Sequence, residues 1–76
     1  DALKDGGIKP TVFNSADEAA GELFMQGKIS YLGISDAIAK AMSEIKNIEN
    51  PTISDIWETD KLARESVYRF EKESLI

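Results

Sequence analysis

Cysteine and histidine are both absent from this chain of 76 residues. Without cysteine there is no disulfide framework and no thiolate metal site. Without histidine the chain lacks the commonest general base and the commonest ligand of transition metals. These two absences exclude hydrolytic triads and zinc sites of the usual kinds.

Clustered basic residues and long apolar runs are missing too. The chain has nine Lys and Arg against fourteen Asp and Glu, a net charge of -5, and its basic residues are scattered. Because neutralising phosphates takes clustered Lys and Arg, we expect no nucleic-acid partner. No apolar run approaches the roughly 20 residues that cross a bilayer. No secretory signal is visible either, so we expect no membrane contact and a cytoplasmic location.

The size and the opening residues suggest one small domain taken from a longer protein. A hydrophobic fraction of 42% is ordinary for a chain that folds. Residues 1–7 look like the end of a helix and its glycine stop, and a natural protein rarely begins in this way. We therefore expect residues 1–9 to be the end of a preceding helix with a linker, and residues 10–76 to form a helical domain.

A first helix is predicted to begin at Asn14 or Ser15 and to stop at Gly27. Ser15 and Glu18 fit a capping box, Asn14 could cap as well, and Asp17 with Glu18 places negative charge in the first turn. Before it, residues 8–13 are too short and too marked by proline for a central strand. The apolar stripe has helical spacing and comprises Ala16, Ala19, Ala20, Leu23 and Phe24.

Two or three further helices are predicted, which makes the fold class all-α, a small bundle of three to four helices. A second helix follows residues 29–33 and must end before the turn at residues 47–51, because Pro51 biases Asn50 away from the helical region. Thr52 or Ser54 can cap a short third helix, and Thr59 with Asp60 offers the cap of another. No segment alternates with the period of two that a strand needs.

Trp57 and the charged residues after it are predicted to have structural roles. Trp57 could be a stacking platform, but its spacing from Ile53 and Ile56 favours a buried core position. Ion pairs are predicted between residues four apart on one helix face, Asp60 with Arg64 and Glu65 with Arg69.

Two functional readings of the acidic residues and serines are weaker than their structural readings. The pairs Asp17–Glu18 and Asp55–Glu58 could ligate a divalent cation, but acids at helix starts are favoured by the dipole alone and no calcium loop is present. A small acidic helical domain could also be a carrier protein with a phosphopantetheine arm. Carriers place the modified serine after an acid, whereas Ser35 and Ser54 each precede one, and capping is the better account of Ser54.

Three segments resemble the 1-deoxy-D-xylulose 5-phosphate reductoisomerase family. Residues 10–18 (Pro-Thr-Val-Phe-Asn-Ser-Ala-Asp-Glu) are similar to its Pro-x-Val-Leu-Asn-Ala-Ala-Asn-Glu. Residues 24–34 (Phe-Met-Gln-Gly-Lys-Ile-Ser-Tyr-Leu-Gly-Ile) are similar to its Phe-Leu-x-Gly-Arg-Ile-x-Phe-Leu-Asp-Ile. Residues 54–65 (Ser-Asp-Ile-Trp-Glu-Thr-Asp-Lys-Leu-Ala-Arg-Glu) look like its Glu-Asp-Ile-Leu-Glu-Ala-Asp-x-x-Ala-Arg-Glu. The blocks occur in the family's order and spacing.

Four positions depart from that pattern. Asp17 stands where the family commonly has Asn, and Gly33 where it commonly has Asp. Gly21 and Glu22 stand at positions that are usually small and apolar. Glycine in a helix interior costs roughly 1 kcal/mol relative to alanine.

The resemblance implies the helical C-terminal domain of a three-part enzyme. In that family an N-terminal Rossmann domain binds NADPH, and a middle domain holds a divalent cation (Mg or Mn) and the substrate. The reaction rearranges and reduces 1-deoxy-D-xylulose 5-phosphate to 2-C-methyl-D-erythritol 4-phosphate, a step toward isoprenoids. None of the family's cofactor, metal or phosphate signatures matches here. The chain itself is therefore expected to contain no catalytic, cofactor-binding or metal-binding residue.

The expected partner is the catalytic domain of the same polypeptide, in a parent enzyme that is expected to be a homodimer. Asn14, Ser15, Asp17 and Glu18 are the candidate contacts between the domains, because packing within one helix does not require that polar sequence. The alternative is a stand-alone acidic helical adaptor or carrier-type domain that binds a protein partner. The length of the reading frame distinguishes them, since the reading frame of an adaptor would extend upstream only to about Asp1.

Overall fold

The computed structural model describes residues 7–73, which form three α-helices: α1 (Lys9–Met25), α2 (Tyr31–Glu44) and α3 (Ile53–Glu73). No strand occurs within this range, so the predicted all-α class is confirmed. The helix end predicted within residues 1–6 lies outside the described residues.

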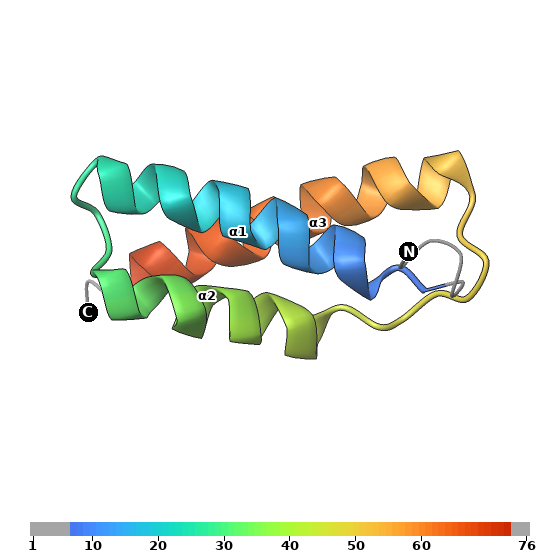
Figure 1. Ribbon diagram of the computed structural model, residues 1–76, viewed down its shortest axis with the longest axis horizontal. Helices are drawn as coiled ribbons and strands as arrows, with labels where there is room; N and C mark the ends of the chain where they lie inside the picture. The colour runs from blue at the N-terminus through green and yellow to red at the C-terminus, as the bar shows by residue number, and fades with distance from the viewer. Residues whose placement is uncertain (1–6, 74–76) are drawn as a thin grey trace.

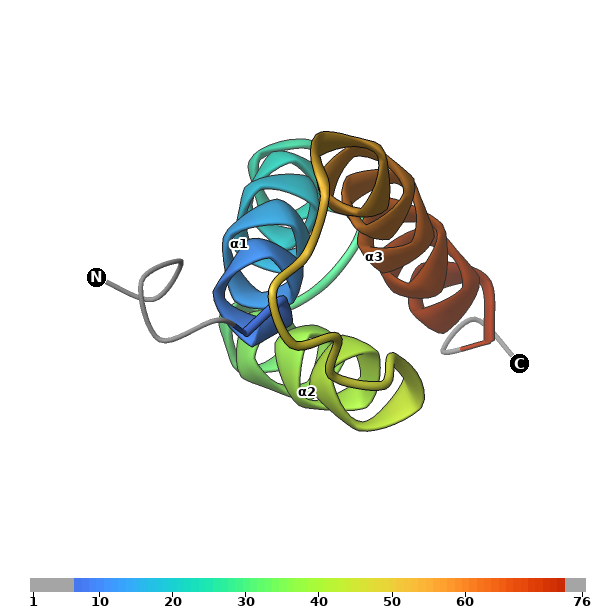
Figure 2. The ribbon, with the colours of Figure 1, turned by 90° about the vertical axis from the view of Figure 1, so that its right-hand side faces the viewer.

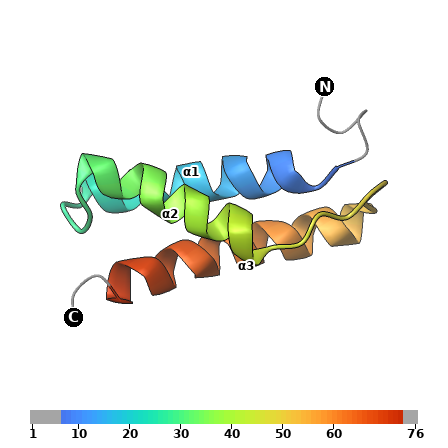
Figure 3. The ribbon, with the colours of Figure 1, turned by 90° about the horizontal axis from the view of Figure 1, so that it is seen from below.

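The three helices form an up-down-up bundle in which each helix contacts the other two. α2 runs back along α1 after a tight turn, and α3 returns in the same direction as α1 (Figures 1 and 3). Seen along its length in Figure 2, the bundle is triangular. The molecule is elongated, with extents of 37 × 20 × 17 Å. The α1–α2 turn and the beginning of α3 therefore lie at opposite ends (Figure 1).

The core is built mainly from small side chains. Alanines occupy most of the buried positions where the helices meet, which allows close packing of their backbones. Larger isoleucine, methionine and phenylalanine side chains close the sides and are only partly buried. The buried cluster comprises Val12, Ala16, Ala19, Ala20, Leu23, Ala37, Ala41, Ala63 and Val67.

The predicted start of the first helix at Asn14 or Ser15 is wrong, because α1 begins at Lys9. Proline is well tolerated in the first helical turn, where its missing N–H is not needed, and Pro10 lies there. The N-cap residue Ile8 offers no capping side chain, but its N–H donates to Asn47 Oδ1 at 3.0 Å. Ile8 is also fully buried. Ile8 and Lys9, which the expected linker of residues 1–9 includes, thus belong to the folded domain.

Lys9 also ties the beginning of α1 to the end of α2. Its Nζ donates to the backbone carbonyls of Met42 and Ile45. A cation at the C-terminus of a helix interacts favourably with the helix dipole, and these carbonyls have no partner within the helix.

The predicted stop at Gly27 is confirmed. Gly27 has φ +74°, the Lys28 N–H donates to Leu23 O at 2.9 Å, and the Gly27 N–H donates to Phe24 O at 2.9 Å. This is a Schellman motif, which needs the left-handed conformation that glycine adopts without strain. After the turn, Ser30 Oγ accepts from the Gly33 N–H at 3.0 Å and caps α2.

The last segment is one continuous helix, so the fourth helix predicted from Thr59 and Asp60 is wrong. Thr52 and Asp55 form a reciprocal capping box at the start of α3, with both bonds at 3.0 Å. Thr52 is therefore the cap, and the capping role given to Ser54 is wrong. Thr59 is buried in the bundle. α3 therefore continues through Thr59 without a break.

The predicted burial of Trp57 is also wrong, because its side chain is 74% exposed and Ile53 is 69% exposed. The buried face of α3 comprises Thr59, Ala63, Ser66 and Val67. Trp57 lies two residues before Thr59, about 200° around the helix, and therefore points away from the core. A bundle that packs alanine against alanine has no room for an indole.

Candidate functional site

The four residues predicted to contact another domain lie in the middle of α1, and the structure divides them into two pairs. Ser15 is buried and Glu18 reaches across to α3, whereas Asn14 and Asp17 are exposed. This division follows from helix geometry, because neighbouring residues point about 100° apart. The sequence block is continuous, but its side chains face two different surroundings.

Ser15 is bonded within the domain. Its hydroxyl donates to Asp60 Oδ1 on α3 at 2.5 Å, between residues 45 apart in the chain. This hydrogen bond, assisted by the bonds from Arg64, lowers the pKa of Asp60 below its ordinary value, although partial burial opposes the shift. Ser15 therefore joins α1 to α3 rather than capping a helix.

Arg64 completes this junction by binding two carboxylates. Its Nε lies 3.1 Å and 3.2 Å from the two Asp60 oxygens, which confirms the predicted pair, and its NH2 lies 2.9 Å from Glu18 Oε1. The hydrogen bond to Glu18, followed by that to Asp60, raises the pKa of Arg64. Ser15, Glu18, Asp60 and Arg64 thus form one polar network, here called the α1–α3 junction.

A second carboxylate, that of Glu44, joins α2 to α3 by hydrogen bonds and ion pairs. Its Oε1 accepts from the buried Ser66 hydroxyl at 2.7 Å and lies 3.3 Å from Arg69 NH2, while Lys40 lies 3.2 Å from Oε2. The Ser66 bond is the main cause of the lowered pKa of Glu44. Arg69 therefore contacts Glu44 and not Glu65, so that predicted ion pair is wrong. Sequence patterns within one helix could not reveal this partner.

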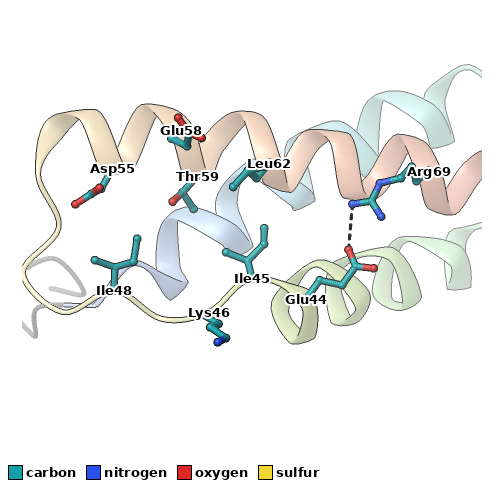
Figure 4. Close-up of a pocket in the computed structure, with 9 residues that line it drawn as sticks. All are labelled: Glu44, Ile45, Lys46, Ile48, Asp55, Glu58, Thr59, Leu62 and Arg69. Carbon is teal, nitrogen blue, oxygen red and sulfur yellow. Dashed lines mark hydrogen bonds and ion pairs between the residues drawn. The ribbon is translucent and has the colours of Figure 1, made fainter.

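A groove lies beside Glu44. It has a volume of about 370 Å³ and lies between α3 and the segment after α2 (Figure 4). Ile45 and Leu62 give it an apolar centre, and Ile48 lies at the end near Asp55. Asp55 and Glu58 lie toward one end, and Arg69 and Glu44 toward the other (Figure 4).

Large apolar side chains are exposed at the α1–α2 turn. Met25 is 83%, Tyr31 73% and Leu32 77% exposed. Phe24 packs edge-to-face on Tyr31 with ring centroids 5.9 Å apart. These four residues, here called the turn patch, all lie within the second segment that resembles the reductoisomerases. The sequence pattern showed apolar residues here but did not show that they face outward.

Among residues 7–73 no group of three or more acidic side chains is placed to hold a metal ion. No described helix is both long enough and apolar enough to span a membrane. The interactions found here stabilise the bundle and shape its surface.

Comparison with known proteins gives a consistent result. A family model described as the DXP reductoisomerase C-terminal domain matches residues 1–66. The 1-deoxy-D-xylulose 5-phosphate reductoisomerase of Thermoanaerobacter pseudethanolicus is 46% identical over 67 residues, which cover 88% of this chain and 18% of that protein. That of Halalkalibacterium halodurans is 43% identical over 65 residues, 86% of this chain and 17% of that protein. That of Bacillus subtilis is 44% identical over 61 residues, 80% of this chain and 16% of that protein.

The chain spans about 18% of the length of the curated relatives it matches. No solved structure matches it significantly.

Proposed function

Because the chain belongs to the family of DXP reductoisomerase C-terminal domains, we propose that it is the structural, non-catalytic domain of such an enzyme. The parent enzyme would convert 1-deoxy-D-xylulose 5-phosphate to 2-C-methyl-D-erythritol 4-phosphate for isoprenoid biosynthesis. The match over residues 1–66 is the observation that carries this proposal.

The parent's other properties are implied by the resemblance. They are the use of NADPH and of Mg²⁺ or Mn²⁺, assembly as a homodimer, and a cytoplasmic location. The described part of this chain does not fit either bound group. It holds no cluster of metal ligands and no strand followed by a glycine-rich phosphate turn. Both groups would therefore be bound elsewhere in the parent protein.

The structural role that we propose is to present a rigid helical body to the catalytic domain. α3 is tied to α1 through Asp60 and to α2 through Glu44, so the three helices are held at defined positions. Of the proposed contacts, Asn14 and Asp17 have exposed side chains that could bond directly to another domain. Ser15 and Glu18 would contribute indirectly, by holding α1 in place through the α1–α3 junction.

A stand-alone adaptor remains the alternative, and the groove in Figure 4 is the observation that favours it. An apolar centre between charged ends is suited to one face of an amphipathic helix. The length of the reading frame distinguishes the two functions. The reading frame of a reductoisomerase continues far upstream of Asp1, whereas that of an adaptor does not.

The direct experiment compares three proteins: the full-length product of that reading frame, the same protein cut before residue 7, and the isolated chain. The full-length protein should oxidise NADPH when supplied with 1-deoxy-D-xylulose 5-phosphate and Mn²⁺. The isolated chain should neither turn over this substrate nor bind NADPH, and the truncated protein should lose activity or solubility. A full-length protein without this activity would refute the proposed parent reaction. Full activity after truncation would refute the structural role.

A further inference from the structure

The outward side of α1 carries a stripe of residues that the core does not use. Asn14, Asp17, Gly21 and Met25 are spaced by three, four and four residues, which places them along one side of the helix. Asn14, Asp17 and Met25 are exposed. The buried residues of α1, among them Ala16 and Leu23, lie on its other side.

Gly21 in this stripe has no explanation within the domain. Glycine is the least favourable residue after proline in a helix interior. Gly21 has no positive φ, and a Cβ built on it would meet no heavy atom within 4 Å. By contrast, Gly27 has φ +74°, and a Cβ on Gly33 would lie 3.3 Å from Ile29 Cβ. A glycine that its own domain does not require allows another backbone to approach the helix closely.

The stripe runs directly into the turn patch. Met25 belongs to both, Tyr31 and Leu32 are exposed at the start of α2, and Tyr31 contacts Phe24, the neighbour of Met25 in the chain. The Phe24–Tyr31 ring contact and the Schellman motif at Gly27 hold this end in one conformation. Exposed apolar side chains that gather on a rigid surface are typical of a contact site. We name this whole surface the docking face: Asn14, Asp17, Gly21, Met25, Tyr31 and Leu32.

We propose that the docking face packs on the catalytic domain of the same polypeptide, with the α1 backbone at Gly21 in direct contact with that domain. This inference rests on the proposed function and names the surface through which it acts. The curated relatives supply such an occupant, because the match covers only 18% of their length.

Charge also favours this occupant over a second copy of the chain. Asp17 and Glu22 are exposed acids of α1, and each copy carries a net charge of -5. Two such surfaces repel each other. The part of the catalytic domain that faces Asp17 should therefore present Lys, Arg or backbone N–H groups. The part that faces Met25 and Leu32 should be an apolar depression.

The experiment uses Gly21→Gln and a matched control, Ala39→Gln, at an exposed position of α2. In the isolated chain Gly21→Gln should raise the melting temperature, since glutamine favours helix and nothing obstructs it. Ala39→Gln should leave it nearly unchanged. Amide hydrogen exchange is then measured over residues 21–34 in the isolated chain and in the full-length protein. Docking predicts at least tenfold slower exchange in the full-length wild type, with the difference lost in Gly21→Gln and kept in Ala39→Gln.

The proposal is overturned if exchange over residues 21–34 is the same in the isolated and full-length wild-type proteins. It is also overturned if Gly21→Gln stabilises both proteins equally and leaves the protection intact. Sedimentation that shows the isolated chain to be a dimer, dissociated by Gly21→Gln, would identify a second copy as the occupant and refute the proposal. Because exchange does not depend on turnover, missing reductoisomerase activity would refute the proposed reaction without deciding the docking face.

Discussion

The hydrogen bond between Ser15 and Asp60 should be worth a measurable share of the stability of this domain. It joins α1 to α3, and its donor is a buried hydroxyl. Replacing Asp60 by alanine removes a charged acceptor and leaves the Ser15 hydroxyl without this partner, which costs about 1–3 kcal/mol. The Asp60 side chain is 43% exposed, so its ion pair with Arg64 is screened by solvent and adds only about 0.3–0.5 kcal/mol.

The expected total for Asp60→Ala is about 1.3–3.5 kcal/mol. A domain of this size has a free energy of unfolding of roughly 4–11 kcal/mol, so this variant should lose a large part of it. At roughly 4–8 °C per kcal/mol, its melting temperature should fall by about 5–28 °C. Urea unfolding followed by far-UV circular dichroism measures the free energy, and thermal unfolding measures the shift.

A double-mutant cycle isolates the bond from the helix propensities of the substituted residues. Ser15→Ala, Asp60→Ala and the double variant should give a coupling energy of about 1–2 kcal/mol. Asn14→Ala is the matched control, because Asn14 is exposed in the interior of α1 and its loss should be neutral or slightly stabilising. A coupling energy below about 0.3 kcal/mol would refute the argued role of the bond. A loss of about 1 kcal/mol of stability in Asn14→Ala would instead indicate that Asn14 caps a helix.

Three further predictions concern other parts of the bundle. Trp57 fluorescence in the isolated chain should resemble that of free tryptophan, and Trp57→Ala should cost less than about 0.5 kcal/mol, because the indole is exposed; a blue-shifted emission would contradict the outward orientation. The pKa of Glu44 is lowered in the folded state, so its stabilisation is present above the pKa of the unfolded chain and is lost as pH falls through the folded value. Unfolding measured below about pH 4.5 should therefore show stability that rises with pH, and Glu44→Gln should make that rise shallower; an unchanged slope would exclude Glu44 as its source. Gly27→Ala should destabilise by about 1 kcal/mol or more in thermal unfolding, because φ is +74°, and an unaffected melting temperature would argue against the Schellman motif.

Features that depend on a few neighbouring residues were predictable from the sequence. The stop at Gly27 and the turn before Pro51 each follow from backbone preferences of the residues themselves, whereas the sequence left the cap of α3 open between Thr52 and Ser54. The start of α1 was not predictable in this way. Its N-cap residue, Ile8, is held by a bond from its N–H to Asn47, in the segment between α2 and α3, while Asn14 and Ser15 offered a local cap that the chain does not use.

The candidate contact residues show the same limit. Sequence placed Asn14, Ser15, Asp17 and Glu18 together because they are neighbours in the chain. The fold separates them, since Ser15 and Glu18 contact residues of α3 that lie 45 and 46 positions away. The sequence could predict that each of these residues lies in a helix. It could not predict which residue of another helix each one bonds to.

The sequence by itself determined the all-helical class, the main turns and the family. Each of these depends on local backbone preference or on motif order, and neither changes when the helices are packed. The apolar stripe predicted for α1 is largely buried, with Ala16, Ala19 and Leu23 in the core, but only the tertiary structure decided which side of α3 is buried. The period of 3.6 residues sets the angle between Trp57 and Thr59, but it does not say which of the two faces the core. Close packing of small residues buried Thr59, Ala63 and Val67 and left the tryptophan in solvent, because alanine-lined helices lie too close together to enclose it.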